Sequence, residues 1–473
     1  MNNTPQSDPK KPITRRTFVS TASALGTGIV LSSTPAKSLT RPIKKDELNI
    51  AIVGFGSQGK VLVDSIYKIG PSVRIKAVCD IWPYKIKKWL SKMRGKKVQI
   101  GEFNTYQDFH KMLDHERDLD CVIIASPDFV HAEHTNAALR AGCHVYCEKL
   151  MSNTVEGARS MVQTQRETGK LLQIGHQRRS NPRYQFIKDT LIDQVSLCGQ
   201  ITAVNGQWNR AVTADIKSSP GIALDETTLN RYGYRNMHEF ENWRWYKRYG
   251  GGPLSDLGAH QIDIYNWFLG NNPKSVIAEG GVDFYPGHEW YDNVMVVYRF
   301  DTNQGTTRAF YQVQTTTSAG GGYYEYFMGT EGAIRVSENH KYSRIFQEAL
   351  ASTEEGANQN PWIKWQKQGL IVRNDGTKSW EKPKSLQQLT SSSTAKVDSR
   401  ETAPLVEWNI PITLGNKSIH QCHLENFFDA VRGEATLNCP ADVAFASTVT
   451  VLAANEAVAA EKKLYFSPQD FIA

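Results

Sequence analysis

The most constraining feature of the sequence is a glycine-rich loop that joins an apolar, β-branched run to a segment of helical spacing. The run at 48–54 is typical of a buried parallel strand, and the spacing of apolar residues over 58–69 predicts a helix. Glycines here permit a tight turn, and the following helix N-terminus offers free N–H groups to a pyrophosphate. The motif therefore predicts dinucleotide binding through Gly54-Phe55-Gly56-Ser57-Gln58-Gly59.

An acidic residue at the end of the second predicted strand completes this pattern. Asp80 closes the strand-like run at 73–80, 24 residues beyond Gly56. A carboxylate in this place accepts hydrogen bonds from ribose hydroxyls and repels a 2′-phosphate, so the predicted cofactor is NAD rather than NADP.

Strand-like and helical segments alternate over 46–178, which predicts a Rossmann domain with a doubly wound parallel sheet. Ligands in such sheets bind beyond the carboxyl ends of the strands. The predicted strands are 48–54, 73–80, 119–126, 143–149 and 171–177, and the predicted helices are 58–69, 83–93, 106–115, 131–141 and 154–168.

After about residue 180 the sequence changes character, and 473 residues suggest two domains. We expect an α+β domain over 179–473 with a mostly antiparallel sheet. Its indications are strand-like runs at 275–284, 293–300 and 307–315 and two closing helices at 419–433 and 441–461. The polar segment 350–408 is predicted to be an irregular insertion.

The first forty residues have the layout of a secretory signal. Arg15 and Arg16 precede the moderately apolar stretch 18–31, and small residues follow up to Ala36. The paired arginines predict recognition by the twin-arginine export machinery, which moves folded proteins, and hence a periplasmic location. The alternative is a disordered basic tail followed by a short helix.

Charge and cysteine content narrow the classes of function. Of the formal net charge of +7, the first 36 residues carry +3, and the remainder has no long basic stripe, so nucleic-acid binding is not predicted. No run of eighteen apolar residues follows the N-terminus, and stable membrane insertion is not expected.

The seven cysteines are scattered along the sequence and do not have the pattern of a disulfide framework. Cys143 and Cys147 flank a histidine, but no second cluster with zinc spacing follows, so no metal site is predicted.

Chemically active residues follow strand ends or share a helix face. Glu148 and Lys149 close the strand 143–149, where a lysine can relay a proton, although most lysines are simply exposed. If 255–269 is a helix, Asp256, His260 and Asp263 lie on one stripe, and a carboxylate beside an imidazole fixes its tautomer. The alternative is a helix-capping aspartate with a partly buried histidine.

Further candidates lie at the edges of the expected crevice. His176 ends the strand 171–177, and Ser126, Pro127 and His131 lie where the strand 119–126 passes into the next helix. Aromatic faces stack on sugar C–H groups and arginines donate to hydroxyls, so carbohydrate binding is predicted for a second set, unless its tryptophans belong to the core. This set comprises Trp208, Arg210, Trp243, Arg244 and Trp245.

Taken together, these motifs resemble the Gfo/Idh/MocA superfamily of oxidoreductases from about Leu48 to the C-terminus. The carriers are the glycine loop, Asp80, 125–131 (ASPDFVH), Glu148-Lys149, 251–260 (GGPLSDLGAH), 326–334 (YFMGTEGAI) and the closing segment NFFDAVRGEATLNCPADVAFAS. The resemblance implies a Rossmann domain followed by an α+β domain with a large open sheet, and a homo-oligomer, dimer or tetramer. It implies cofactor contacts at Ser126, Pro127, His131, Glu148 and Lys149.

The same resemblance implies roles for three residues. His260 is the expected acid/base, Lys149 assists proton transfer and orients the hydroxyl, and Asp256 positions the pair. Leu150 stands where the family commonly has proline, which removes the φ constraint on the turn that aims Lys149.

The expected activity is NAD(H)-dependent oxidation of a secondary hydroxyl of a sugar, polyol or glycoside, with a cofactor that stays bound because the periplasm lacks a free NAD pool. One alternative is a glycosidase that oxidises C3, eliminates the aglycone, adds water and re-reduces the sugar. The other is a sugar-sensing protein without activity, against which Lys149, Asp256 and His260 together argue.

Overall fold

A computed structural model describes residues 46–96, 100–348, 360–374 and 405–473. The predicted twin-arginine signal therefore lies outside the described residues.

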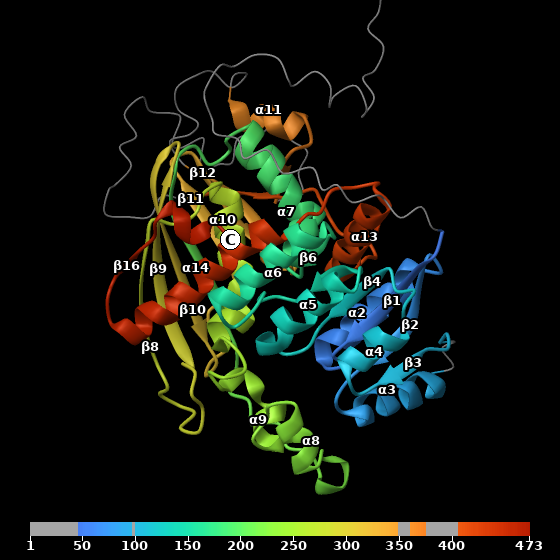
Figure 1. The fold of residues 1–473 in the computed structure, drawn as a ribbon. Coiled ribbons are helices and arrows are strands. Elements are labelled where there is room, and N and C mark those ends of the chain that lie inside the picture. Colours follow the sequence, from blue (N-terminus) through green and yellow to red (C-terminus); the bar gives the residue numbers. More distant parts are fainter. Residues whose placement is uncertain (1–45, 97–99, 349–359, 375–404) are drawn as a thin grey trace, which may run out of the picture. The chain divides into compact units, whose positions relative to one another are not determined.

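The first sheet has six strands, all parallel, in the order β3-β2-β1-β4-β5-β6 (Figure 1). The strands are β1 Leu48–Val53, β2 Val73–Cys79, β3 Asn104–Tyr106, β4 Cys121–Ile124, β5 His144–Cys147 and β6 Leu172–Ile174. The helices are α2 Ser57–Ile69, α3 Pro83–Gly95, α4 Phe109–His115, α5 His131–Arg140 and α6 Val155–Thr168. This arrangement confirms the predicted Rossmann domain, and its order reverses between β1 and β4, where such sheets bind ligands.

The second sheet has ten described strands in the order β14-β15-β13-β12-β11-β7-β10-β9-β8-β16, and within it β7 and β10 are the one parallel pair. The strands are β7 Ile201–Asn209, β8 Ser275–Gly281, β9 Asn293–Thr302, β10 Gly305–Gln314, β11 Tyr323–Gly329, β12 Gly332–Val336, β13 Arg344–Gln347, β14 Val372–Arg373, β15 Val406–Asn409 and β16 Leu464–Tyr465. The predicted mostly antiparallel sheet is confirmed.

Side chains of the second sheet alternate between a core face and an open face. On β9, Val294, Val296 and Tyr298 are buried, whereas Met295 is 45% and Val297 38% exposed. Alternation of this kind is typical of a sheet covered on one side. The covered side packs against α10 Ala259–Leu269 and α14 Ala441–Ala460, while α13 Ile419–Arg432 packs against α2 of the first sheet.

By length and composition, α14 is apolar enough to cross a membrane, with a mean hydropathy of 1.5 over its most apolar window. That window is 72% buried inside the protein, which is the behaviour of a core helix. Its neighbours in the core account for its apolar sequence.

The segment predicted to be an irregular insertion contains regular structure in its described part. The helix α11 Pro361–Lys367 buries Trp362 and Trp365, and β14 and β15 extend the second sheet at one edge. The prediction is therefore wrong for 361–373 and 406–408. The tryptophans of this segment pack in the core, but the polar residues around them along the chain gave no indication of it. Residues 349–359 and 375–404 lie outside the described part.

Between β7 and α10 the chain forms a small unit, residues 211–249, which we call the cap segment. It includes α8 Glu226–Arg231 and α9 Met237–Glu241 (Figure 1). Its own core consists of Leu229, Tyr234, Tyr246 and Tyr249, against which Ile81 and Phe129 of the first domain pack. The cap segment is thus attached to the Rossmann domain as well as to the second sheet.

Candidate active site

The glycine loop forms a tight cradle between β1 and α2. Gly54 has a φ of +88°, and a Cβ on it would lie 2.5 Å from the carbonyl oxygen of Ala125. A Cβ on Gly59 would lie 2.1 Å from the Gly54 carbonyl oxygen, whereas a Cβ on Gly56 would meet nothing within 4 Å. The first turn of α2 has no side-chain cap, so its N–H groups face the open space at Gly56.

Asp80 is held at the loop by two backbone donors. The N–H of Phe55 donates to one carboxylate oxygen at 2.6 Å, and the N–H of Trp82 donates to the other at 2.7 Å. Burial raises the pKa of Asp80, and these two donors oppose the rise. The carboxylate has further lone pairs that can accept hydrogen bonds, and its predicted contact with ribose hydroxyls stays a prediction.

A cavity of about 700 Å³ runs from this loop to the predicted catalytic residues. Cavities of this size hold small ligands and cofactors. Its walls include these predicted residues: Gly54, Gly56, Ser57, Gln58, Asp80, Ser126, Pro127, His131, Glu148, Lys149, Trp208, Arg210, Trp243, Arg244, Asp256 and His260. Phe55 and Gly59 instead support the loop from behind, and Phe55 is fully buried.

The imidazole of His131 connects the loop after β4 to the turn after β5 by two hydrogen bonds. Its Nδ1 lies 2.8 Å from the carbonyl oxygen of Leu150, and its Nε2 lies 2.7 Å from that of Ser126. Both contacts need a proton on the ring nitrogen. Although burial opposes the charged form, contacts with Cys147, Asp128 and the Leu150 carbonyl raise the pKa of His131 to about 10. The ring is thus committed to holding the turn after β5.

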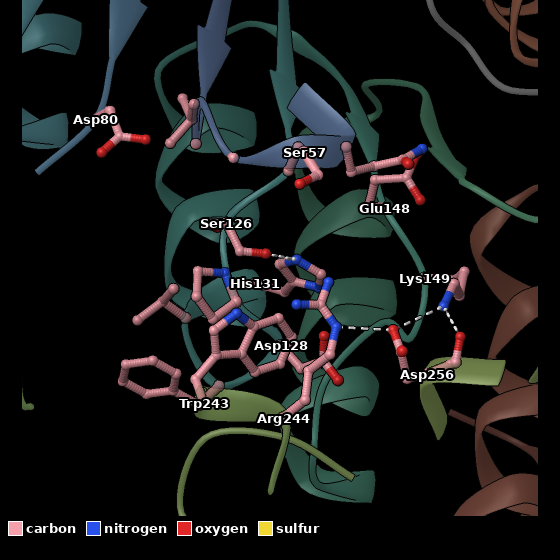
Figure 2. Close-up of a pocket in the computed structure, with 18 of the residues that line it drawn as sticks. Ser57, Asp80, Ser126, Asp128, His131, Glu148, Lys149, Trp243, Arg244 and Asp256 are labelled. Atoms are coloured by element: carbon pink, nitrogen blue, oxygen red, sulfur yellow. Dashed lines mark hydrogen bonds and ion pairs between the residues drawn. The ribbon is translucent and has the colours of Figure 1, made fainter. Parts of the chain in front are cut away.

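That turn aims Lys149 into the cavity (Figure 2). Leu150, which stands in place of the family proline, is buried in the core of the second domain, and its peptide bond with Lys149 is cis. Its buried side chain and its bonded carbonyl fix the turn. The neighbouring Glu148 accepts from Gln58 Nε2 at 2.9 Å and from the Tyr146 hydroxyl at 3.2 Å.

Cations surround Asp256. Arg244 Nε donates to its Oδ1 at 2.9 Å, and Lys149 Nζ and Arg210 each lie 3.8 Å from a carboxylate oxygen. Lys149 Nζ also donates to the Asp256 carbonyl (Figure 2). Burial alone would raise the pKa of Asp256, but Arg244, Lys149 and Arg210 hold it below its ordinary value. The carboxylate is therefore ionised and holds Lys149.

No hydrogen bond between Asp256 and His260 is among the described contacts, since the Asp256 carboxylate accepts from Arg244. Leu254–Gly258 forms a π-helical turn before α10 begins at Ala259. Asp256 and His260 both line the cavity on either side of this change from π-helical to α-helical turn. Nδ1 of His260 has no hydrogen-bond partner among the described residues. Burial, with Lys149 and Arg178 nearby, lowers the pKa of His260 well below its ordinary value, so the ring is neutral and able to accept a proton.

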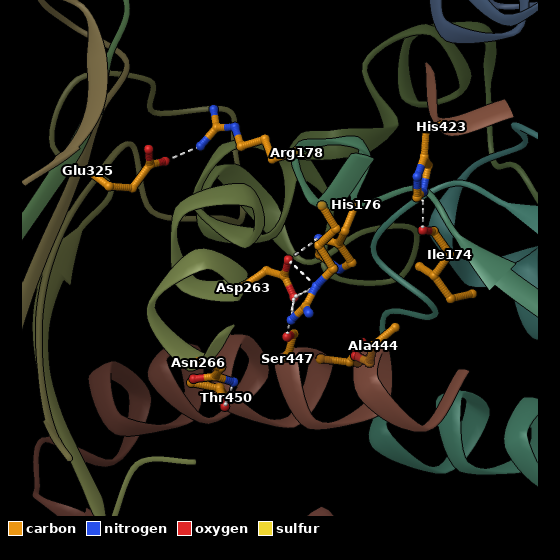
Figure 3. A network of polar contacts seen from close by, with 12 residues as sticks. Ile174, His176, Arg178, Asp263, Asn266, Glu325, His423, Ala444, Ser447 and Thr450 are labelled. Atoms are coloured by element: carbon orange, nitrogen blue, oxygen red, sulfur yellow. Dashed lines mark hydrogen bonds and ion pairs between the residues drawn. The ribbon is translucent and has the colours of Figure 1, made fainter. Parts of the chain in front are cut away.

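His176 lies behind His260 and not on the cavity wall, which corrects its predicted substrate contact. It is 1% exposed, and its ring centroid lies 6.3 Å from that of His260. Its Nδ1 lies 3.8 Å from Asp263 (Figure 3). The Asp263 carboxylate accepts from Nε and from one terminal nitrogen of Arg179 and from the Ser447 hydroxyl at 2.7 Å. Asp263 was predicted to share a stripe with Asp256, but it belongs to this buried network.

Trp208 presents a ring beside His260, with the centroids 6.1 Å apart, and its other neighbour Tyr323 stacks on it at 4.4 Å. Arg210 lies 5.7 Å from the Trp208 ring and Arg244 lies 4.3 Å from the Trp243 ring. The predicted aromatic and arginine set is therefore gathered at one end of the cavity, except for Trp245, which stacks on His288 at 4.1 Å.

Comparison with known proteins identifies the family. Residues 48–176 match the Gfo/Idh/MocA oxidoreductase family, described as having an NAD-binding Rossmann fold, and residues 223–335 match the C-terminal domain of the same family. The chain belongs to the Gfo/Idh/MocA family. The predicted family and the NAD-binding domain are confirmed.

Several Gfo/Idh/MocA relatives are known by name. The chain is 31% identical to D-glucoside 3-dehydrogenase of Escherichia coli strain K12 over 47% of its own length and 54% of that protein. It is 26% identical to inositol 2-dehydrogenase of Salmonella typhimurium strain LT2, over 48% of this chain and 56% of that one. The chain thus spans about half the length of the curated relatives that it matches.

Solved structures share the Gfo/Idh/MocA fold over most of the chain. Levoglucosan dehydrogenase in complex with NADH and levoglucosan gives a TM-score of 0.62 at 18% identity, and covers 89% of this chain and 99% of that one. The WlbA dehydrogenase from Chromobacterium violaceum, in complex with NADH and UDP-GlcNAcA, gives a TM-score of 0.60 at 17% identity, over 91% and 99% of the two chains. At these identities the likeness establishes the fold.

The residues of this Gfo/Idh/MocA site fit NAD. The glycine loop and the uncapped N-terminus of α2 would hold the pyrophosphate, and the Asp80 carboxylate would bind the adenosine ribose. Lys149 and His260 line the other end of the same cavity. Among the described residues, no group of three or more His, Cys, Asp or Glu side chains could hold a metal ion. All seven cysteines are free thiols, and six of them are buried.

Sequence reasoning missed several residues of the wall. Asp128, Gln177, Glu338 and His420 line the catalytic end, and Ile216, Phe240 and Glu241 line the cap side. The run 177–183 (QRRSNPR) carried a signal, because adjacent arginines directly after a strand are unusual in a core. Arg178 is 1% exposed and binds Glu325 and Glu338. The cap residues carried no such signal.

Proposed function

We propose that this protein is an NAD-dependent oxidoreductase that oxidises a secondary hydroxyl of a sugar, polyol or glycoside. The observation that carries the proposal is the single cavity in which the glycine loop, Asp80, Lys149 and His260 meet. A neutral, buried imidazole next to a lysine ammonium is the pair that removal of a hydroxyl proton requires.

Each group has a defined part in this oxidation. His260 accepts the hydroxyl proton, Lys149 donates a hydrogen bond to the oxygen as it becomes a carbonyl, and Asp256 holds Lys149 in place. When bound, NAD supplies the acceptor for the hydride that leaves the carbon. One C–H bond and one O–H bond break, and the C–O bond becomes C=O.

Trp208 is the proposed platform for the sugar ring. Its ring stacks on Tyr323 from one side and is tilted by 34° relative to the His260 imidazole. A pyranose that lies with its C–H face on Trp208 would direct a ring hydroxyl toward His260. The names of the relatives, which include a glucoside dehydrogenase and an inositol dehydrogenase, support this substrate class.

We further propose that the cofactor stays bound between turnovers. The cap segment is attached to the Rossmann domain at the adenosine end: Trp82 Nε1 donates to the Ile222 carbonyl at 2.7 Å, Tyr232 donates to the Gln107 carbonyl at 2.7 Å, and Arg231 donates to Asp108 at 2.5 Å. Closure over this end favours a cycle without cofactor release.

Retention also suits the proposed location. We propose export in folded form by the twin-arginine machinery into the periplasm, which rests on Arg15 and Arg16 and fits the free thiols, since the fold needs no oxidising compartment. Cell fractionation of the wild type and of an Arg15→Lys, Arg16→Lys variant tests this, because the variant should remain in the cytoplasm.

A homo-oligomer, dimer or tetramer, is proposed through the open face of the second sheet. Ile277 is 49% and Met295 45% exposed there, next to Val297. Light scattering after size exclusion tests this proposal, and a monomer at micromolar concentration would contradict it.

The deciding experiment purifies the protein without added cofactor, assays NAD(H) released on denaturation, and then offers free sugars and glycosides to the intact enzyme. NAD that becomes bound NADH together with a keto-sugar supports the dehydrogenase. The closed cap also favours the redox-neutral glycosidase, which would release aglycone and free sugar without net NADH. Failure to bind any nucleotide would refute both.

A further inference from the structure

Arg210 differs from Lys149 and Arg244 in that its side chain makes no hydrogen bond among the described contacts. Arg210 follows β7 directly, and its backbone N–H donates to the Gln314 carbonyl at 2.8 Å. This hydrogen bond fixes the backbone from which the side chain extends. Its side chain is 50% exposed, lines the cavity and lies 5.7 Å from the ring of Trp208. The described ion-pair contact of its guanidinium is Asp256, at 3.8 Å.

Asp256 is already satisfied by other groups. Its Oδ1 accepts from Arg244 at 2.9 Å and lies 3.8 Å from Lys149 Nζ. Three cations therefore share one carboxylate at this end of the cavity. One of their positive charges is balanced by Asp256 and the others face the ligand space.

Two further carboxylates at this end of the cavity, Glu338 and Asp128, form no described ion pair with Arg210. Glu338 is bound to Arg178 at 2.7 Å, and Arg178 is further paired with Glu325. Asp128 is buried, and burial raises its pKa. The nearby charges of His131, Lys149 and Arg244 oppose that rise. The nicotinamide of NAD in its oxidised form would add another positive charge to the same end.

A half-exposed guanidinium that makes no described side-chain hydrogen bond and lies near an aromatic ring is suited to bind an oxyanion. Arginine presents two parallel N–H donors that match a carboxylate or sulfate, and stacking on an aromatic ring pre-orients the fork. Half exposure keeps the cost of removing water from Arg210 small. A neutral hydroxyl would use one donor and leave the surplus charge uncompensated.

We infer that the substrate is an anionic sugar, with its ring on Trp208 and a carboxylate or sulfate group on Arg210. This inference rests on the proposed function, and it names the substrate class of the same site. Arg210 is then a specificity residue that touches the substituent, while His260 and Lys149 act at the hydroxyl.

The test compares sugars that differ in one group. Methyl glucosides of both anomers are offered to NAD-loaded enzyme next to the corresponding methyl glucuronides and 6-sulfated glucosides. Because each bound NAD is reduced once, the limiting rate of bound-NADH formation serves as kcat and the half-saturating sugar concentration serves as KM. Binding is measured independently by quenching of tryptophan fluorescence. We expect the charged sugars to be favoured about tenfold to a hundredfold, the effect of one charge-assisted contact.

The variants separate this contact from general damage. Arg210→Gln should remove the preference by raising KM with little change in kcat, and Arg210→Lys should retain part of it for both anions. The control is Arg248→Gln, since Arg248 lies beside Tyr249 and does not line the cavity.

The outcomes distinguish the possible failures. Preference for the glucuronide alone indicates that the site selects a carboxylate. Equal preference for the sulfated sugar indicates that the site selects any oxyanion by its charge. Neutral glucosides that bind and react as well as the charged sugars overturn the inference and leave the proposed oxidation intact. If no sugar reduces the cofactor, the proposed function fails, while tighter binding of the anions than of the neutral sugars would still support the site at Arg210.

Discussion

At the residue scale, the catalytic end combines one neutral base with several fixed charges. His260 is buried and uncharged, and the cations around it do not need to titrate during the reaction. Lys149 and Arg244 lower the cost of the developing negative charge on a substrate oxygen, while His260 takes the proton. This division of labour makes His260 the position at which loss of one group should be most costly.

His260→Asn is expected to lower kcat about 10²-fold to 10⁴-fold, the usual contribution of an acid/base group. Bound NAD released on denaturation should stay at the wild-type amount, because His260 lies at the far end from the glycine loop. His110→Asn is the control, since His110 is 59% exposed and pairs with Glu133 on the surface. Unchanged turnover in His260→Asn would remove His260 from the mechanism.

Asp80→Ala is expected to weaken NAD binding about tenfold to a hundredfold, because hydrogen bonds from the ribose hydroxyls to a carboxylate are lost. The ratio of NAD to NADP affinity should fall as well, since the repulsion of a 2′-phosphate disappears. Titration of refolded, cofactor-free protein with each nucleotide measures both effects. Asp64→Ala on the exposed side of α2 serves as the control. An unaltered ratio would contradict the assigned role of Asp80.

Local sequence predicted the residues whose position depends on one strand and one loop. The glycine loop, Asp80 and Lys149 follow directly from strand ends. His176 and Asp263 could not be assigned in the same way. Whether their side chains face the cavity or the core depends on residues from distant segments that pack against them. Here Arg179 and Ser447, from distant segments, draw Asp263 into the core.

At the scale of elements, the start of α10 sets the geometry of the site. The π-helical turn Leu254–Gly258 turns Asp256 toward Lys149 and Arg244 and leaves His260 at the first turn of the α-helix. Further along, Asp263 ties α10 to Arg179 and to α14. This helix therefore carries both a catalytic group and a structural anchor.

Asp263→Asn should destabilise the fold by about 3–5 kcal/mol at neutral pH, because Arg179 is left buried without its counter-charge. Burial opposes ionisation of Asp263, but Arg179 and the neighbouring donors hold its pKa below the ordinary value. The contribution is therefore present above the unfolded pKa of about 4 and is lost as the pH falls through the folded pKa.

Urea unfolding at pH 7 and at successively lower pH checks this sign. The difference in free energy of unfolding between wild type and Asp263→Asn should be largest at pH 7 and should shrink toward acid. Asp301→Asn, which breaks an exposed pair with Arg299, should change stability by less than about 1 kcal/mol. A difference that grows toward acid would contradict the stated role of Asp263.

The cap segment has its own anchor in Asp215. Its two carboxylate oxygens lie 2.9 Å from Nε2 of His238 in α9 and 2.9 Å from Nε2 of His288, which lies between β8 and β9. Asp215→Asn removes one of these acceptors and should loosen the cap, so that bound NAD exchanges with labelled NAD several-fold faster. Glu226→Gln, at an exposed position in α8, should exchange at the wild-type rate. Equal rates in both variants would mean that the cap does not retain the cofactor.

At the scale of the whole molecule, the site is assembled from two sheets and the segment between them. The alternation of apolar strands and helices was sufficient to predict the first sheet and its ligand edge. The second sheet was predicted as mostly antiparallel, but its strands β7 and β11 were missed, because they carry tryptophan or tyrosine at partly exposed positions. The cap core was not predicted, because its tyrosines meet only after β7 and α10 are placed.

Because residues from both sheets and the cap line one cavity, bound NAD should stabilise the whole described chain and not the Rossmann domain alone. A ligand that binds only the folded state adds about 4 kcal/mol when present at about 1,000 times its Kd. We therefore expect protein stripped of NAD to melt several degrees lower than the protein as purified. Re-addition of NAD should restore the Tm in the wild type and only partly in Asp80→Ala.

Tryptophan fluorescence and far-ultraviolet circular dichroism, followed together during heating, distinguish the two possibilities. Nine of the eleven tryptophans follow the Rossmann domain in the sequence, so fluorescence reports mainly on the second domain and cap, whereas Trp82 and Trp89 belong to the Rossmann domain. If both signals shift upward together on NAD addition, the cofactor couples the domains. A shift confined to one of two separate transitions would mean that NAD is held by the Rossmann domain alone, and the proposed retention by the cap would then fail with it.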